Sequence, residues 1–196
     1  MRFARLTLLA LVLVAMALPT MADEITDQIM QAIELYKAGD YAGAAGDLEF
    51  AAAQIRQMRA GEISAALPEA LAGWVAQDTE TASMGASYMG GATSANRSYT
   101  KDEASIDVNI LTDSPMLSSL SMLLNNPMLL STSGQKLIRV EGNKGALDWD
   151  GDSGDLNVVV NGNVLVSLSA SNCTKDDLMA YAEAVDYALI KKLMSQ

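Results

Sequence analysis

The chain has 196 residues, of which 24 are acidic, 13 are basic and none is histidine. The lack of histidine excludes Ser/His and Cys/His nucleophile pairs, imidazole zinc sites and histidine-ligated haem. The net charge of −11 and the lack of a strongly basic stretch make nucleic acids and anionic lipid surfaces poor partners. No P-loop or dinucleotide-binding fingerprint is present, so we expect a non-enzymatic protein without a cofactor, with a carboxylate-based hydrolase as the remaining enzyme class.

The first 22 residues have the pattern of a secretory signal peptide. Arg2 and Arg5 precede an apolar run at residues 8–18, and a short segment ending in Ala22 follows it. We expect cleavage near Ala22, which leaves a periplasmic or secreted protein with a net charge of −13. The apolar run is shorter than the roughly 20 residues that a membrane span needs, so no stable membrane insertion is expected.

Residues 23–61 are predicted to form a helical hairpin. Ile25, Ile29 and Ile33 recur at helical spacing until Gly39 interrupts the pattern, and a second helix is expected to follow. Small and large apolar residues stand where a tetratricopeptide repeat packs its two helices: Ala32, Leu35, Gly39, Tyr41, Ala44, Leu48 and Ala51. The segment therefore resembles one tetratricopeptide-repeat hairpin.

A single hairpin of this kind cannot bury all of its apolar residues. Tetratricopeptide repeats normally need about three copies to form a continuous core, and only one copy is recognisable here. We expect Leu35, Tyr36, Tyr41 and Leu48 to contact a protein partner; packing on the rest of the chain is the alternative.

Residues 62–196 are predicted to form an α+β domain, in which helices flank an antiparallel sheet. Residues 82–96 are rich in glycine, alanine and serine and have little periodicity, so we expect a mobile loop that is either an ordinary connection or a ligand-binding loop. Ile106, Val108 and Ile110 alternate with polar residues, which predicts a strand with one buried face.

Four further strands are predicted after residue 134. Turn signals at Gly142 and Asn143, near Gly151, and at Asn161 and Gly162 separate alternating apolar residues. These signals predict a four-stranded antiparallel meander.

Residues 114–134 contain Met116, Met122 and Met128 at six-residue spacing. A step of six residues points successive side chains of a helix in different directions, and no histidine is available as a further ligand. We therefore expect these methionines to fill a core and not to bind copper.

The same segment is predicted to be a helix that begins at Ser114 and Pro115 and ends or kinks at Asn126 and Pro127. One apolar face should cover the sheet: Met116, Leu117, Leu120, Leu123 and Leu124. Met122 is a candidate contact for a protein partner.

Asp148, Asp150 and Asp152 match the first three ligand positions of a calcium-binding loop. Ser153 and Val159 stand where such a loop requires glycine and glutamate, so an acidic turn that keeps a sheet edge solvated is favoured. A weak calcium site is the alternative.

A helix is predicted for residues 175–193, with Thr174 and Asp177 as a capping box. Its apolar stripe should lie on the sheet: Leu178, Tyr181, Ala182, Val185, Leu189 and Leu193. Cys173 is the only cysteine, which excludes an internal disulfide and favours an inert, partly buried thiol.

The order of elements over residues 67–193 resembles the α+β domain of PsbP-like proteins, and the whole chain is similar to small exported bacterial proteins. This resemblance implies an accessory or scaffold role. We expect an exported, non-enzymatic protein that acts through protein contacts. The alternative is a module that binds a small ligand or, weakly, calcium.

Overall fold

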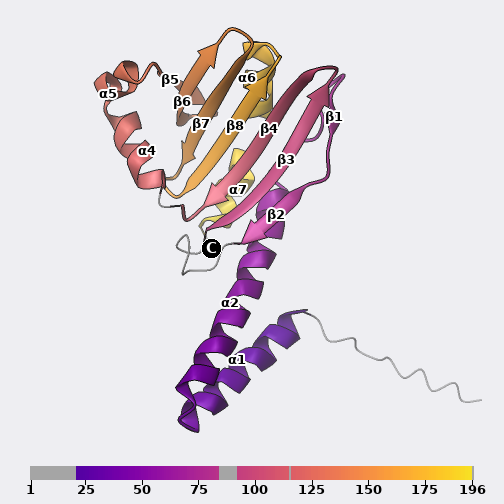
Figure 1. Cartoon of the computed structure of the whole chain (residues 1–196), viewed down its shortest axis with the longest axis vertical. Helices are drawn as coiled ribbons and strands as arrows, with labels where there is room; N and C mark the ends of the chain where they lie inside the picture. The colour runs from indigo at the N-terminus through magenta and orange to yellow at the C-terminus, as the bar shows by residue number, and fades with distance from the viewer. Residues whose placement is uncertain (1–20, 84–91, 115, 196) are drawn as a thin grey trace, which may run out of the picture. The chain divides into compact units, whose positions relative to one another are not determined.

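The computed structural model describes residues 21–83, 92–114 and 116–195 (Figure 1). A pair of N-terminal helices precedes an antiparallel sheet with flanking helices, which confirms the expected α+β class. The chain divides into two compact units, Met1–Leu48 and Glu49–Gln196, and the division falls within helix α2 (Tyr41–Ser64). In the described part of the chain, every helix is too short or too polar to cross a membrane.

The first unit contains α1 (Met21–Lys37) and the start of α2, so the predicted pair of helices is confirmed. Gly39 has a φ of +84°, which suits a residue that ends a helix in the left-handed region. Asp40 then caps α2, because its Oδ1 accepts a hydrogen bond from the Gly43 N–H at 2.9 Å. Ile25, Ala32 and Ala44 are buried. Most of the expected signal peptide lies outside the described residues.

The second unit is built on an eight-stranded antiparallel sheet with the order β1-β3-β4-β8-β7-β6-β5, in which β2 also pairs with β3. The predicted four-stranded meander is confirmed as β5 to β8, and β4 joins it through β8. The strands have the following bounds: β1 Val75–Ala76, β2 Glu80–Ser83, β3 Thr93–Lys101, β4 Ala104–Thr112, β5 Lys136–Val140, β6 Asn143–Asp150, β7 Ser153–Val160 and β8 Val164–Ser171.

The prediction of a loop at residues 82–96 was wrong at both ends of this range. Residues 82–83 belong to β2 and residues 93–96 to β3, while residues 84–91 lie outside the described residues. Strand β3 was not predicted because most of its residues are small or polar and do not show an apolar alternation. Ala95 and Tyr99 are nevertheless fully buried on one face of this strand.

The turns of the meander lie at the glycines that predicted them, but the β5–β6 turn is one residue earlier than predicted. Glu141 and Gly142 have positive φ angles and form the turn between β5 and β6, so the prediction that placed Asn143 in this turn was wrong. Asn143 is the first residue of β6. Asn161 and Gly162 both have positive φ angles in the β7–β8 connection, as predicted.

One face of the sheet packs against α6 (Lys175–Ala184) and α7 (Tyr187–Leu193) (Figure 1). The single C-terminal helix that we expected is broken, because the Asp186 carboxylate accepts from the Leu189 N–H at 2.8 Å and begins a new helix. The Asp186 N–H donates to the Ala66 carbonyl at 3.0 Å, a contact distant in sequence. After this break Tyr187 and Ile190 are buried, whereas the stripe residues Leu189 and Leu193 are only partly buried.

Part of the other face is covered by α4 (Met116–Asn125) and α5 (Pro127–Thr132), with the break where Asn126 and Pro127 predicted it. Leu124 and Leu130 pack against Ala146 of β6 and Val159 of β7. Leu117 is also buried, and Leu120 and Leu123 are partly buried.

The prediction that the three methionines fill the core was wrong. Met116 is 62% exposed, Met122 70% and Met128 78%. Leu117, Leu120 and Leu124 recur at steps of three and four and occupy the face of α4 that meets the sheet. Met122 lies on nearly the opposite side of the same helix, and Met116 sits at its first position, beyond the covered stretch.

Candidate functional site

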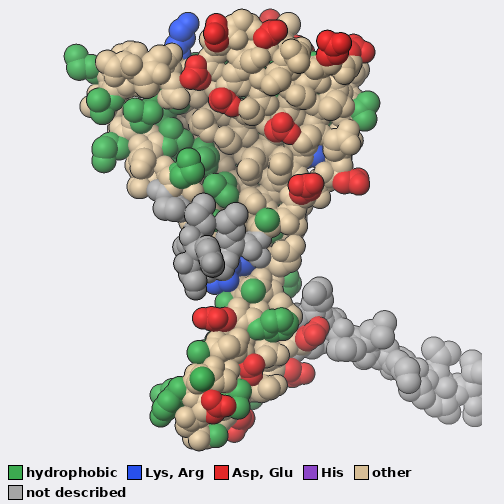
Figure 2. All heavy atoms as spheres, in the orientation of Figure 1, with side chains coloured by type: hydrophobic (Ala, Val, Ile, Leu, Met, Phe, Trp, Pro, Cys, Tyr) green, Lys and Arg blue, Asp and Glu red, His purple; other side chains and the backbone are tan. Residues whose placement is uncertain are grey.

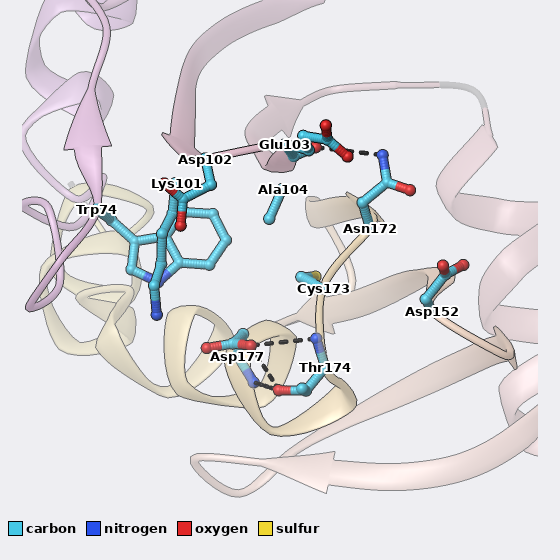
Figure 3. Close-up of a pocket in the computed structure, with 10 residues that line it drawn as sticks. All are labelled: Trp74, Lys101, Asp102, Glu103, Ala104, Asp152, Asn172, Cys173, Thr174 and Asp177. Atoms are coloured by element: carbon cyan, nitrogen blue, oxygen red, sulfur yellow. Dashed lines mark hydrogen bonds between the residues drawn. The ribbon is translucent and has the colours of Figure 1, made fainter.

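A pocket of about 740 Å³ lies at one end of the sheet, where several connections meet (Figure 3). The β3–β4 turn supplies Asp102 and Glu103, the β8–α6 connection supplies Cys173 and Thr174, and the β6–β7 turn supplies Asp152. These segments are far apart in sequence, so no local motif indicated this pocket.

Trp74 lines one side of the pocket and belongs to an aromatic cluster. The Trp74 ring meets the Tyr181 ring edge-on, with 5.3 Å between centroids, and the Lys101 ammonium lies 6.0 Å from the Trp74 ring centroid. The Tyr99 ring is 4.4 Å from Tyr181, and its hydroxyl donates to the Pro68 carbonyl at 2.5 Å. These contacts attach the segment that contains Pro68 and Trp74 to the sheet.

Arg97, which no sequence motif indicated, binds the same segment. Its Nε donates to the Gln77 carbonyl at 3.0 Å and its Nη1 to the Pro68 carbonyl at 3.3 Å. The side chain therefore has a structural role on a strand whose small residues leave room for it.

The Asp177 carboxylate in the pocket is already committed to a hydrogen-bond network. It accepts from the Thr174 N–H at 3.1 Å and from the Thr174 hydroxyl at 2.5 Å, and the Thr174 hydroxyl oxygen accepts from the Asp177 N–H at 3.2 Å. This confirms the predicted capping box. The hydrogen bond from Thr174 is the main cause that lowers the pKa of Asp177.

Cys173 is free and buried beside this cap. Burial is the main cause that raises the pKa of its thiol, and the negative charges of Asp177 and Asp152 raise it further. A protonated thiol without a histidine is a poor nucleophile. The pocket therefore lacks an activated nucleophile.

The three aspartates of the calcium hypothesis are spread along one hairpin. Asp148 and Asp150 are exposed on β6, and Asp152 is exposed in the following turn. Asp148 faces Asp155 across the β6–β7 ladder. Among the described residues, no group of three or more acidic or thiol side chains is placed to hold a metal ion.

The uncovered part of the second sheet face is polar. Ser98 donates to Asp107, and the Ser169 hydroxyl donates to Asp155 at 2.6 Å, across adjacent strands. This ladder leaves Asp148 and Asp155 on a solvated part of the sheet face.

A group of exposed apolar side chains lies over α4, α5 and β5, and Figure 2 shows hydrophobic side chains gathered there. We call this group the methionine patch: Met116, Met122, Met128, Leu129 and Leu137. The chain has no acidic residue between Asp113 and Glu141. Arg139 and Lys144 are exposed cross-strand neighbours on the sheet face that α4 partly covers, and Lys144 donates to the Asn125 side chain at 2.7 Å. Two basic side chains therefore border the patch on β5 and β6, although the protein as a whole is acidic.

A second group of exposed apolar side chains lies on the helical pair. Met30, Ile33 and Tyr36 recur every three residues on α1, and Tyr41 and Leu48 are seven apart on α2, so each set lies on one side of its helix. We call these five residues the tyrosine stripe. Tyr36 is 64% exposed and Tyr41 67%.

The predicted interaction residues are divided between these two surfaces. Tyr36, Tyr41 and Leu48 are exposed in the tyrosine stripe, and Met122 is exposed in the methionine patch. Leu35 is only half-buried and lies outside the stripe. Met116 and Met128, which we expected in the core, join Met122.

Comparison with protein-family models, curated proteins and solved structures finds no match to this chain. The relations to tetratricopeptide repeats and to PsbP-like proteins stay predictions.

Proposed function

We propose that the chain is an exported, non-enzymatic accessory or scaffold protein that acts by binding protein through the methionine patch and the tyrosine stripe. The observation that carries this proposal is the exposure of Met116, Met122 and Met128 together with two leucines in one region. Soluble monomers rarely leave contiguous apolar patches of more than a few hundred Å² in water, and larger ones mark interaction sites.

The composition of the methionine patch suits a protein interface. Methionine is unbranched and polarisable, so it adapts to the shape of an apolar partner. The buried neighbours Leu124 and Leu130 fix α4 and α5 on the sheet, and the exposed methionines are therefore presented from anchored helices. Association would bury these side chains at roughly 25 cal/mol for each Å² removed from water.

The chemistry of the pocket supports a role without catalysis. Its thiol is held protonated, and its Asp177 carboxylate is engaged by Thr174. A small-ligand module, the alternative function, would use the same pocket, and its four carboxylates and single ammonium would favour a cation. Lys101 already lies over the Trp74 ring, where such a cation would bind best, so we favour protein binding.

Export is part of the proposal and rests on the N-terminal signal pattern. If it is correct, the protein recovered from the periplasm or medium of a producing bacterium has the mass of residues 23–196. An intact mass that retains residues 1–22 would contradict export by cleavage.

Affinity capture with the full mature protein tests the binding role. We expect wild type and the control Glu183→Ala, at an exposed position on α6, to retain the same protein from a periplasmic extract. Met122→Asp should lose it while keeping the wild-type free energy of unfolding, because a carboxylate cannot be buried in an apolar interface without a large cost. Equal retention by all three proteins would contradict a role for the patch.

A further inference from the structure

We propose that one partner is a second copy of this chain, whose tyrosine stripe docks on the methionine patch. This inference rests on the proposed function and names the partner of the same two surfaces. The two surfaces are both apolar and exposed, but they differ in the charge of their borders.

The tyrosine stripe has an acidic surrounding. Six acidic residues and one lysine lie between residues 23 and 48, and three of the acidic side chains are exposed beside or between the stripe residues: Asp27, Glu34 and Asp40. The single lysine, Lys37, is engaged by Glu34 at 2.8 Å. The border of the stripe is therefore negative.

The methionine patch has the opposite border. Arg139 and Lys144 are exposed beside it, and the run from residue 114 to residue 140 contains no carboxylate side chain. An apolar centre with a basic border complements an apolar centre with an acidic border. Aromatic rings and thioether sulfurs also make favourable contacts, so Tyr36 and Tyr41 suit a surface of methionines.

The same charges disfavour symmetric pairing. Two tyrosine stripes would bring carboxylates together, and two methionine patches would bring Arg139 and Lys144 together. Docking of the tyrosine stripe of one copy on the methionine patch of another avoids this repulsion between like charges. Because its two sides are different surfaces, the contact is heterologous and generates a ring or an open head-to-tail assembly.

The expected affinity is modest. Each surface has five large exposed apolar residues, so the buried area should lie at the small end of the range for specific protein interfaces. We therefore expect a dissociation constant on the order of micromolar or weaker. Attraction between exposed charges is screened by salt, so the association should weaken as ionic strength rises.

Sedimentation velocity of the full mature protein, from about 10 μM to about 1 mM, tests the proposal. We expect the average molecular mass to rise with protein concentration. At a fixed protein concentration, the average mass should fall when the salt concentration is raised from about 0.05 to about 0.5 M. Tyr36→Asp and Met122→Asp should each abolish self-association, whereas the control Glu183→Ala should not. Urea denaturation must show that both variants unfold with the stability of wild type.

Mixing the two defective variants gives the sharpest result. Tyr36→Asp keeps an intact methionine patch and Met122→Asp keeps an intact tyrosine stripe, so an equimolar mixture should form a heterodimer and nothing larger. A mixture that stays monomeric while wild type associates would overturn the heterologous contact. Wild type that remains monomeric at about 1 mM would overturn the second-copy proposal itself.

Two other occupants give distinct outcomes. Binding to anionic phospholipid vesicles that Met122→Asp abolishes and Tyr36→Asp leaves intact would overturn the proposal in favour of a lipid surface. A monomeric wild type that still captures a different protein through Met122 would overturn self-association and leave the proposed function standing.

Discussion

The ring of Tyr36 lies 5.6 Å from the ring of Tyr41, across the turn that joins α1 to α2. The two rings are tilted by 58° and both are exposed, so the pair forms an aromatic surface at the end of the first unit. Tyrosine supplies a large rigid contact area at low cost in conformational entropy and is enriched in the centres of protein interfaces. This pair is therefore the aromatic part of the tyrosine stripe.

The different burial of Leu124 and Met122 on one helix leads to a prediction for stability. Leu124→Ala should lower the free energy of unfolding by about 2 to 5 kcal/mol, because it opens a cavity against Ala146 and Val159. Met122→Ser should change it by less than about 0.5 kcal/mol. Urea denaturation measures both. Large losses in both variants would show that Met122 is buried.

Gly154 offers a test of close packing in the β6–β7 hairpin. A Cβ atom at this position would lie 2.7 Å from the Trp149 ring and would clash with the Asp148 carbonyl oxygen, which is backbone and cannot rotate away. Gly154→Ala should therefore cost about 1 to 3 kcal/mol. The matched control is Gly46→Ala in α2, where nothing lies within 4 Å and alanine should be neutral or stabilise by up to about 1 kcal/mol. A neutral Gly154→Ala in thermal denaturation would contradict the described register.

Tyr99 should contribute to a loss of stability at alkaline pH. Burial is the main cause that raises its pKa from 10.0 to about 12. Because the folded state holds this proton more tightly than the unfolded state, the contribution is complete below pH 10 and is lost as the pH rises towards 12. Tyr99→Phe should be less stable at neutral pH, since the hydrogen bond to Pro68 is lost, and its melting temperature should fall less steeply above pH 10. Parallel slopes for the two proteins would contradict this account.

Calcium should have no structural role. The three hairpin aspartates of the calcium motif are exposed, and the positions of Ser153 and Val159 offer neither the glycine nor the glutamate of a calcium loop. Millimolar calcium should leave the melting temperature of the mature protein unchanged. A rise of about ten degrees that Asp150→Asn abolishes would establish a calcium site there.

Local patterns predicted the elements whose causes are local. The alternation at Ile106, Val108 and Ile110 indicated β4, and all three side chains are fully buried. The Thr174 capping box and the break at Asn126 each depend on residues within four positions, and both predictions were confirmed.

Features that depend on distant contacts were missed. Strand β3 has little apolar content, and Arg97 is accommodated there because the carbonyls of Pro68 and Gln77 accept its hydrogen bonds. The break before Tyr187 involves the Ala66 carbonyl, more than one hundred positions away.

The exposure of the candidate surfaces was also predicted only in part. The sequence indicated that a free hairpin has too many apolar residues to bury and named four of them as partner contacts. Tyr36, Tyr41 and Leu48 are exposed, whereas Leu35 is only half-buried. The prediction misplaced Met116 and Met128, because a methionine-rich helix has the same composition whether it fills a core or meets a partner.

Site-specific photo-cross-linking in a producing bacterium tests whether the methionine patch contacts protein. A p-benzoylphenylalanine residue would replace Met122 in one protein, Tyr36 in a second and the exposed control Glu183 in a third. We expect discrete cross-linked species from the proteins with the probe at positions 122 and 36 and none from the protein with the probe at position 183. Where the partner is a second copy, the cross-linked species should have twice the mass of the mature chain. Illumination that yields no cross-linked protein at position 122, from a protein that is exported and folded, would contradict the proposed role of the methionine patch.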